Sequence, residues 1–464
     1  MAAGMSAALL TSALGAGSAT GQTYVNWPQY LYSANHTSDN QAATTITPAN
    51  AADLKLAWTF KPSAAPVPDL AGFQSSPTVY DGVIYIGARN GYFYAINETT
   101  GAVIWSVFVG YVTNKTCAAQ GFTSTATVAP DPKTGDPTVY VYGATGYLYA
   151  LNAADGSEVW PPAEVAIPST TENNYYAWDS PLVFDKHIYV GISSECDDPL
   201  VRAGLDRFSQ ATGALQSTWW TTPVNSKGAS IWSSPATDGS SVFVTTGNGT
   251  ARSEGYSIID LNPALDRKIG IWTLPVADRV TDSDFGGSPG IWTASIDGVS
   301  TELVGACNKN GNFYALQASD LAAGPVWSLD IGNSSTEGPG ECDAAPIYDG
   351  TNLYLSSNGT TINGTAYDGS VRAVDPATGA ILWQTGLNGS IIGTPGMDGA
   401  GVIAAQSYGS TTNQDGVWLL NAANGQILDT IPLTKSNTFG QPVFADNYLF
   451  IASTSDGLRA YTVG

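Results

Sequence analysis

Four short polar segments contain residue types that can take part in chemistry. Glu195 lies in the segment SSECDD, Asn248 in TTGNG, Asp284 in TDSDFGG and Lys309 in NKNG. Carboxylate and amide oxygens are ligands for a hard cation such as Ca²⁺. A lysine beside them suits an anionic or carbonyl oxygen on which charge builds up. Each is also a common loop residue when taken singly, so the chemistry depends on whether the fold brings them together.

A repeated pattern surrounds these segments and predicts the fold. Each copy has a Ser-Pro or Ala-Pro start, a short strand, an Asp-Gly-type turn, a strand like VYVG, a strand like YALN, a TG turn and a final strand with tryptophan. The clearest copies are residues 75–105 and 138–160. Period-2 alternation and glycine at the turns predict four antiparallel strands per copy. Large rings at one position per copy suit the wedge between neighbouring blades, and they are Trp105, Trp160, Trp219 or Trp220, Trp272, Trp327 and Trp383.

The two ends of the chain indicate how the ring closes. The last copy stops at Gly464 after three strands, and a matching fourth strand is found only in LKLAWTF, residues 54–60. Pairing between them would leave no exposed edge, so we predict an all-β, eight-bladed β-propeller over residues 23–464. The alternative is a truncated array with a dangling N-terminal strand.

Register within the repeat places the polar segments together. In a propeller, the loop before the first strand of a blade and the loop after its second strand lie on the same face. Asp284 precedes a first strand, whereas Glu195, Asn248 and Lys309 follow second strands. The sequence therefore predicts that all four converge on one mouth of the central channel.

Composition limits the partners and the compartment. The net charge is −22 with 17 basic residues, which disfavours nucleic acid and anionic membrane surfaces as partners. Residues 1–22 resemble the end of a signal peptide without its basic start, so we expect a secreted or periplasmic protein. No later segment is long and apolar enough to span a membrane.

The four cysteines predict two disulfides in an oxidising compartment. We expect Cys307 to pair with Cys342 and Cys117 with Cys196, near the same mouth of the channel. None lies in a CxxCH motif, so there is no haem c attachment site. His36 and His187 are the only histidines and cannot build a multi-histidine metal site.

The repeat and the entry segments NWPQYLYSANHT and ITPANAADLKLAW resemble the quinoprotein alcohol dehydrogenases, in particular the polyvinyl alcohol dehydrogenase-like propellers. The resemblance extends from Asn26 to the end of the chain. It implies a pyrroloquinoline quinone (PQQ) cofactor and a Ca²⁺ ion in the propeller mouth. It also implies an alcohol substrate and an external electron acceptor, such as a cytochrome c or a dye.

The resemblance assigns a role to five residues. Glu195 and Asn248 match calcium ligands, and Asp284 matches the catalytic aspartate, which also contacts the metal. Lys309 matches the residue that contacts the quinone, and Trp232 matches the tryptophan on which PQQ stacks. Asp282 forms a carboxylate pair with Asp284 that favours a trivalent lanthanide as the alternative to Ca²⁺.

One segment departs from the family pattern. Where relatives often carry two adjacent cysteines followed by an arginine, this chain has Cys117-Ala-Ala-Gln-Gly-Phe122. The roof of the pocket and the partner of the PQQ carboxylates are therefore not assigned.

The implied mechanism has three parts. Ca²⁺ polarises the quinone carbonyl, Asp284 removes the alcohol proton, and Lys309 stabilises the reduced oxygen after hydride transfer. Two alternatives remain. One is a non-catalytic propeller that acts as a secreted scaffold or binding module, and the other is a propeller enzyme with a different chemistry.

Overall fold

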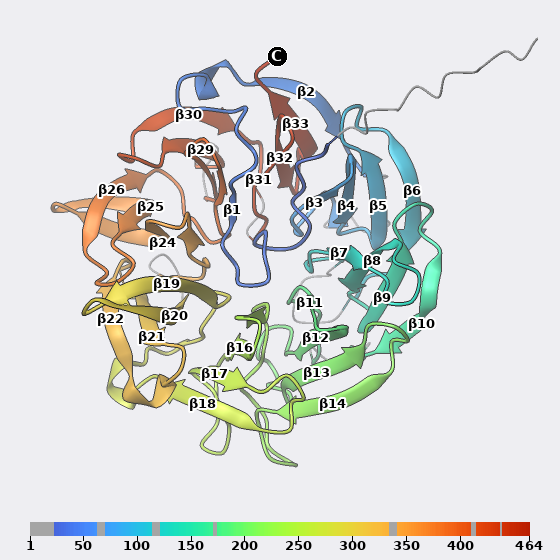
Figure 1. Ribbon diagram of the computed structural model, residues 1–464, viewed down its shortest axis with the longest axis vertical. Coiled ribbons are helices and arrows are strands. Elements are labelled where there is room, and N and C mark those ends of the chain that lie inside the picture. Colours follow the sequence, from blue (N-terminus) through green and yellow to red (C-terminus); the bar gives the residue numbers. More distant parts are fainter. Residues whose placement is uncertain are drawn as a thin grey trace, which may run out of the picture.

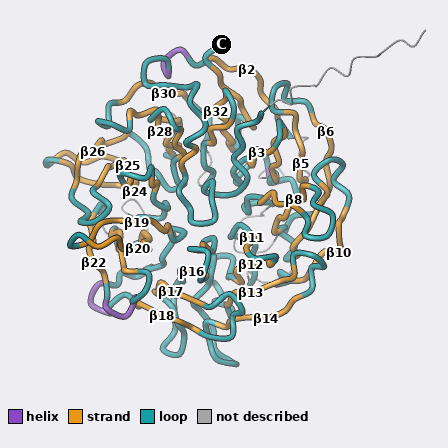
Figure 2. The backbone as a smooth tube through the Cα atoms, in the orientation of Figure 1, coloured by secondary structure: helices purple, strands orange, loops and turns teal. Residues whose placement is uncertain are grey.

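The computed structural model describes residues 23–62, 70–113, 121–169, 174–333, 341–409, 414–436 and 439–464. Eight antiparallel sheets are arranged in a ring around a central axis (Figure 1). Strands dominate the backbone (Figure 2), and short 3-10 helices in the described residues lie in loops at Ala51–Asp53, Val276–Asp278 and Leu321–Ala323. The predicted eight-bladed β-propeller is confirmed. The predicted signal peptide, residues 1–22, lies outside the described residues.

We number the sheets as blades 1 to 8 along the chain and list the strands of each from the inner to the outer position. Blades 1 to 4 are β3 (Thr78–Tyr80), β4 (Val83–Gly87), β5 (Tyr92–Asn97), β6 (Val103–Phe108); β7 (Thr127–Pro130), β8 (Pro137–Tyr142), β9 (Tyr147–Asn152), β10 (Glu158–Glu164); β11 (Leu182–Phe184), β12 (His187–Ile192), β13 (Gly204–Ser209), β14 (Leu215–Trp220); and β15 (Ala236–Thr237), β16 (Val242–Thr245), β17 (Ser257–Leu261), β18 (Lys268–Thr273). Blades 5 to 8 are β19 (Gly290–Ile296), β20 (Val299–Cys307), β21 (Asn312–Gln317), β22 (Pro325–Asp330); β23 (Ile347–Tyr348), β24 (Leu353–Ile362), β25 (Thr365–Val374), β26 (Ile381–Leu387); β27 (Gly396–Asp398), β28 (Val402–Ser407), β29 (Gly416–Asn421), β30 (Ile427–Pro432); and β31 (Val443–Ala445), β32 (Tyr448–Ser453), β33 (Gly457–Thr462), β2 (Lys55–Phe60).

Blade 8 closes the ring as the sequence predicts. β2 pairs antiparallel with β33, and the register runs from Lys55 opposite Thr462 to Phe60 opposite Leu458. An N-terminal strand therefore completes the blade formed by the C-terminus, and β33 is left without an open edge.

Repeated tryptophans fasten several blades to the next one. Trp105 on the outer strand of blade 1 donates its indole N–H to the carbonyl of Ala153 in blade 2, at 3.0 Å. Its ring covers Gly156, where an added Cβ would lie 2.6 Å from the ring. Trp58 makes the same contact across the closing seam, donating to the Glu98 carbonyl at 2.8 Å. The TG turn recurs because only glycine leaves room for the neighbouring indole.

The N-terminal segment 25–40, which we call the strap, crosses the axis and contacts the inner strands (Figure 1). Near its start, Trp27 and Val79 exchange a pair of backbone hydrogen bonds, at 2.8 and 2.9 Å. Strap carbonyls then accept N–H groups from further blades: Pro28 from Val128, Ala34 from Thr237, Asn35 from Ile291, Thr37 from Tyr348 and Ser38 from Met397. β1 (Asp39–Asn40) finally pairs with β27. The sequence did not predict this element.

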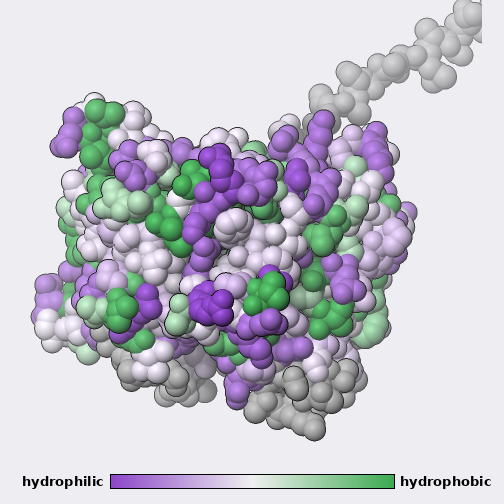
Figure 3. Space-filling model, turned by 90° about the horizontal axis from the view of Figure 1, so that it is seen from below, coloured by the Kyte–Doolittle hydropathy of each residue, from purple (hydrophilic) through white to green (hydrophobic). Residues whose placement is uncertain are grey.

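The outside of the ring carries scattered apolar side chains. Residues of the outer strands such as Leu56, Ile104 and Leu382 are about half exposed. In the side view of Figure 3, hydrophobic side chains form small separate areas between polar ones. No helix in the described part of the chain is long and apolar enough to cross a bilayer.

Candidate functional site

A belt of hydroxyl groups around the axis explains the Ser-Pro start of each blade. The backbone N–H of one blade donates to the hydroxyl of the next: Ser76 to Thr125, Thr125 to Ser180, Ser180 to Ser234 and Ser234 to Ser288, at 2.9 to 3.0 Å. Seven residues line a small cavity of about 50 Å³ and form a floor: Thr123, Trp178, Trp232, Gly286, Asp343, Ile392 and Phe439. Four of them, Thr123, Trp178, Trp232 and Gly286, lie two positions before belt residues.

A larger cavity of about 350 Å³ lies above this floor. It is lined by Trp178, Ser194, Glu195, Cys196, Asp197, Trp232, Asn248, Thr281, Asp282, Asp284, Lys309 and Phe439. All five residues that the sequence singled out are among them. Tyr30 of the strap and Trp232 of the floor both line the small cavity, so the strap lies next to the floor.

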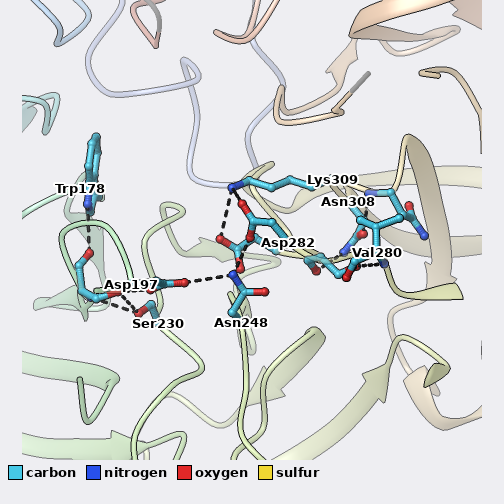
Figure 4. Close-up of polar contacts among 12 residues, drawn as sticks. Trp178, Asp197, Ser230, Asn248, Val280, Asp282, Asn308 and Lys309 are labelled. Carbon is cyan, nitrogen blue, oxygen red and sulfur yellow. Dashed lines mark hydrogen bonds and ion pairs between the residues drawn. The ribbon is translucent and has the colours of Figure 1, made fainter. Parts of the chain in front are cut away.

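Acidic side chains in the cavity surround a single lysine. Lys309 Nζ lies 2.8 Å from Asp282 Oδ2 and 3.4 Å from Asp284 Oδ2. The Asn248 amide donates to Asp197 Oδ2 at 3.0 Å and to Asp282 Oδ1 at 2.5 Å (Figure 4). Blades 3, 4 and 5 thus contribute to one polar network.

Burial changes the protonation of this network. Burial raises the pKa of Asp284 to about 7. The positive charge of Lys309 lowers this pKa, whereas the negative charges of Asp282 and Asp197 raise it further. Burial alone would lower the pKa of Lys309, but the attraction of Asp284, Asp343 and Asp282 outweighs it and raises that pKa. Asp284 is therefore able to accept a proton near neutral pH, while Lys309 stays charged.

The donor set fits a hard cation, although the side chains are not gathered around one. No group of three or more His, Cys, Asp or Glu residues in the described ranges is arranged to hold a metal ion. Asn248 Oδ1 and Asp284 Oδ1 are nevertheless buried without a hydrogen-bond partner among the described residues. Buried, unsatisfied oxygen atoms beside further carboxylates are the ligands that Ca²⁺ and related ions prefer.

Trp232 provides an aromatic surface on the floor of the cavity. Two glycines make room for it, since an added Cβ at Gly286 would lie 3.0 Å from the indole and one at Gly247 would lie 3.3 Å from it. Lys309 Nζ lies 5.4 Å from the ring centroid. An aromatic face with a cation over it fits a planar, anionic molecule such as a quinone that bears carboxylates.

Four further cavity residues were not singled out by the sequence. Trp178 donates its indole N–H to the carbonyls of Ser194 and Glu195, both at 3.1 Å, and so supports the loop that carries Glu195. Phe439 packs edge-on against Trp178, with centroids 5.7 Å apart. Asp197 and Asp343 add carboxylates. Alignment of AWDSP with IWSSP would have found Trp178, because it occupies the same repeat position as Trp232.

The predicted Cys307–Cys342 disulfide is present, with Cα atoms 5.1 Å apart. Cys196 is also disulfide-bonded. Its predicted partner, Cys117, lies outside the described residues, as does most of the segment that departs from the family pattern.

Comparison with protein families gives two matches. Residues 27–320 match the model of the PQQ family, described as the glucose/ethanol/alcohol dehydrogenase beta-propeller domain. Residues 367–463 match a second model, described as outer membrane protein assembly factor BamB. The first match contains all five predicted site residues.

Similar curated proteins include two dehydrogenases. Polyvinylalcohol dehydrogenase of Sphingopyxis sp. (strain 113P3) is 25% identical over 423 residues, which cover 81% of this chain and 54% of that protein. Quinohemoprotein alcohol dehydrogenase of Comamonas testosteroni is 27% identical over 179 residues, or 38% of this chain and 23% of that protein. The chain thus spans about half the length, or less, of these relatives.

Solved structures share the fold at low sequence identity. The crystal structure of quinohemoprotein alcohol dehydrogenase from Comamonas testosteroni aligns with a TM-score of 0.72 and 16% identity, covering 95% of this chain and 81% of that one. A europium-containing methanol dehydrogenase aligns with a TM-score of 0.71 and 15% identity, covering 92% and 89%.

Proposed function

The chain belongs to the PQQ family of glucose/ethanol/alcohol dehydrogenase beta-propeller domains, and from this premise we propose that its cavity binds PQQ with a metal ion and oxidises an alcohol. One observation carries the proposal. Asp284, Lys309, Glu195 and Asn248 converge on Trp232 in a single cavity, and they come from separate segments of the chain. We propose secondary alcohols like those of polyvinyl alcohol as the substrate, because of the similarity to polyvinylalcohol dehydrogenase.

Each residue has a distinct task in this proposal. Trp232 forms the platform under the cofactor, and Lys309 places positive charge at its margin. Glu195, Asn248 and Asp284 hold the metal ion. PQQ supplies the two-electron acceptor when it is bound. Asp284 would take the proton of the alcohol hydroxyl, because its carboxylate is buried in the cavity beside Lys309.

The metal and the electron acceptor are also proposals. Ca²⁺ suits the oxygen ligands, and Asp282 adds a carboxylate that makes a lanthanide the competing ion. We also propose an external electron acceptor such as a cytochrome c or a dye. Secretion or a periplasmic location would provide the oxidising conditions for the disulfides.

The decisive experiment measures binding and turnover together. Calorimetry with PQQ and Ca²⁺, followed by dye reduction with short alcohols and polyvinyl alcohol, should show binding of both and alcohol-dependent reduction. The match of residues 367–463 to BamB favours a second candidate, a secreted scaffold or binding module. A folded sample that binds neither PQQ nor a metal ion would support that candidate instead.

Trp232→Ala should weaken PQQ binding by about ten- to a hundredfold, because stacking on an aromatic side chain contributes about 1–3 kcal/mol for a planar base. Titration of the apoprotein with PQQ measures this loss. Trp220→Ala is the matched control, since Trp220 lies on an outer strand and is 38% exposed. Equal PQQ affinity in the wild type and the Trp232 variant would exclude Trp232 as the platform.

Glu195→Gln should weaken metal binding by about tenfold or more, because a buried charged ligand is replaced by a neutral one. Titrations with Ca²⁺ and with a lanthanide measure the effect on each ion. Glu158→Gln, an exposed position on β10, is the control. An unchanged affinity for both ions would remove Glu195 from the ligand set.

A further inference from the structure

Two acidic side chains, which we call the seam pair, lie where blade 1 meets blade 8. Glu98 follows β5 in the turn that leads to β6, and Asp446 lies in the turn between β31 and β32. Glu98 is 3% exposed. Glu98 Oε2 and Asp446 Oδ2 are both buried, and neither accepts a hydrogen bond from a donor group of the described residues. Closure of the ring thus buries two carboxyl groups beside each other.

The backbone at the seam pair contacts the two N-terminal elements that complete the ring. The N–H of Asp446 donates to the carbonyl of Val25 at 3.1 Å, and Asp446 Oδ1 accepts the Val25 N–H at 2.7 Å. The carbonyl of Glu98 accepts the indole N–H of Trp58 on β2 at 2.8 Å. In Figure 1 this region is the one where the blue and red ends of the chain lie side by side. A displacement of either acidic residue therefore disturbs the start of the strap or the packing of β2.

No positive charge compensates the seam pair within the part of the chain that the structure describes. The ion pairs found there are Lys268–Glu254, Lys309 with Asp282 and with Asp284, and Arg459–Asp456. The titratable residues on the surrounding elements are Tyr24 before the strap, Lys55 on β2, Asp81 beside Gly82, Tyr448 on β32 and Tyr461 on β33. Lys55 is the cation among them, and it takes part in none of these ion pairs. Asp446 is thus the charged group that acts on Glu98.

Two carboxyl groups in contact and out of water cannot both be ionised without a large cost. Burial, and after it the hydrogen bond and the negative charge of Asp446, raises the pKa of Glu98 to about 8. In an unfolded chain the pKa of a glutamate is about 4.3. Between these two values the folded chain binds more protons than the unfolded chain. The contribution of Glu98 to stability therefore falls as the pH rises through this range, and it is constant above it.

We propose that Glu98 and Asp446 share one proton and so make the closure of the ring sensitive to pH. While the proton is present, one carboxyl group donates a hydrogen bond to the other, and the first and last blades are joined. When the proton is lost, two negative charges face each other at the seam, and the start of the strap is bound less firmly. This contact concerns the closure of the ring and is independent of PQQ and of a metal ion in the cavity.

Thermal unfolding of the full chain at about pH 5, 7 and 9 tests the seam pair. In E98Q the amide donates a hydrogen bond to Asp446 and carries no charge. We therefore expect this variant to melt about 2 °C or more above the wild type at about pH 9, and the difference to shrink towards about pH 5. E158Q, at an exposed position on β10, is the matched control and should follow the wild type at each pH.

A second variant tests the partner of Glu98. D446N keeps an oxygen for the Val25 N–H and removes the other negative charge, so it should show the same pH-dependent gain. E98Q/D446N should gain no more than either single variant, because there is one repulsion to remove. Amide exchange at residues 25–27, divided by the intrinsic rate at each pH, should lose about tenfold or more in protection between about pH 5 and about pH 9 in the wild type. E98Q should retain that protection.

Two outcomes would overturn the proposal. A melting temperature of E98Q that lies below the wild type by the same amount at every pH would make Glu98 an ordinary structural contact. The other outcome concerns Ca²⁺ at about pH 9. If Ca²⁺ raises the melting temperature of the wild type clearly more than that of E98Q, the seam pair binds a cation and does not share a proton.

Discussion

Asp284→Asn should reduce alcohol oxidation by at least about a hundredfold while the propeller stays folded. A positioned general base contributes about 10²- to 10⁴-fold to a rate, and the amide cannot accept the proton. Asp284 is 6% exposed, and its Oδ1 has no hydrogen-bond partner among the described residues. Asn keeps an oxygen in place for the metal, so metal binding should suffer less than turnover. Dye reduction under saturating PQQ and Ca²⁺ is the measurement.

Two controls make this result specific. Asp320→Asn changes an exposed aspartate whose side chain makes no capping hydrogen bond, so activity should stay at the wild-type level. Asp282→Asn tests the neighbouring carboxylate, which is the partner of Lys309 at 2.8 Å. If Asp282→Asn abolishes turnover and Asp284→Asn does not, the base has been assigned to the wrong aspartate.

The repeat made most of the fold predictable. Tryptophan and glycine recur because one packs on the other between blades, as Trp105 does on Gly156. The same periodicity located the site, since it fixed which loops share a face. Glu195, Asn248, Asp284 and Lys309 could therefore be placed at one mouth without any knowledge of their contacts.

The remaining features depend on contacts that leave no periodic signal. The strap has no alternation of its own, and its hydrogen bonds go to inner strands that are far away in the sequence, such as β19 and β27. In the sequence, Asp343 looks like an ordinary acidic loop residue, and only the structure shows that Gly286 makes room for it. Floor residues such as Trp178 and Trp232 lie two positions before a Ser-Pro pair, so the sequence contains a signal for them. That signal became recognisable only when the structure showed that the hydroxyl groups form a belt around the axis.

Removal of residues 1–61 should cause aggregation or loss of cooperative folding. The truncation deletes the strap and β2, so β33 loses its partner over five paired positions. It also deletes Trp58, which binds blade 8 to Glu98 and Gly101 of blade 1. Proteins of this kind have a net stability of about 5–15 kcal/mol, and loss of an entire strand and its apolar contacts is of the same order.

Two shorter truncations separate the contribution of the strap to stability from that of β2. Deletion of residues 1–22, which lie outside the described residues, should leave the melting temperature unchanged. Deletion of residues 1–45 removes the whole strap and keeps β2, so the ring should still close while the inner strands lose the hydrogen bonds that Trp27, Ala34 and Asn35 provide. We expect a lower melting temperature but a soluble protein, because the edge of β33 stays covered. Thermal unfolding, monitored by circular dichroism, gives the melting temperatures of the three variants, and light scattering detects their aggregation. If the 1–61 deletion melts like the full chain, β2 does not close the ring.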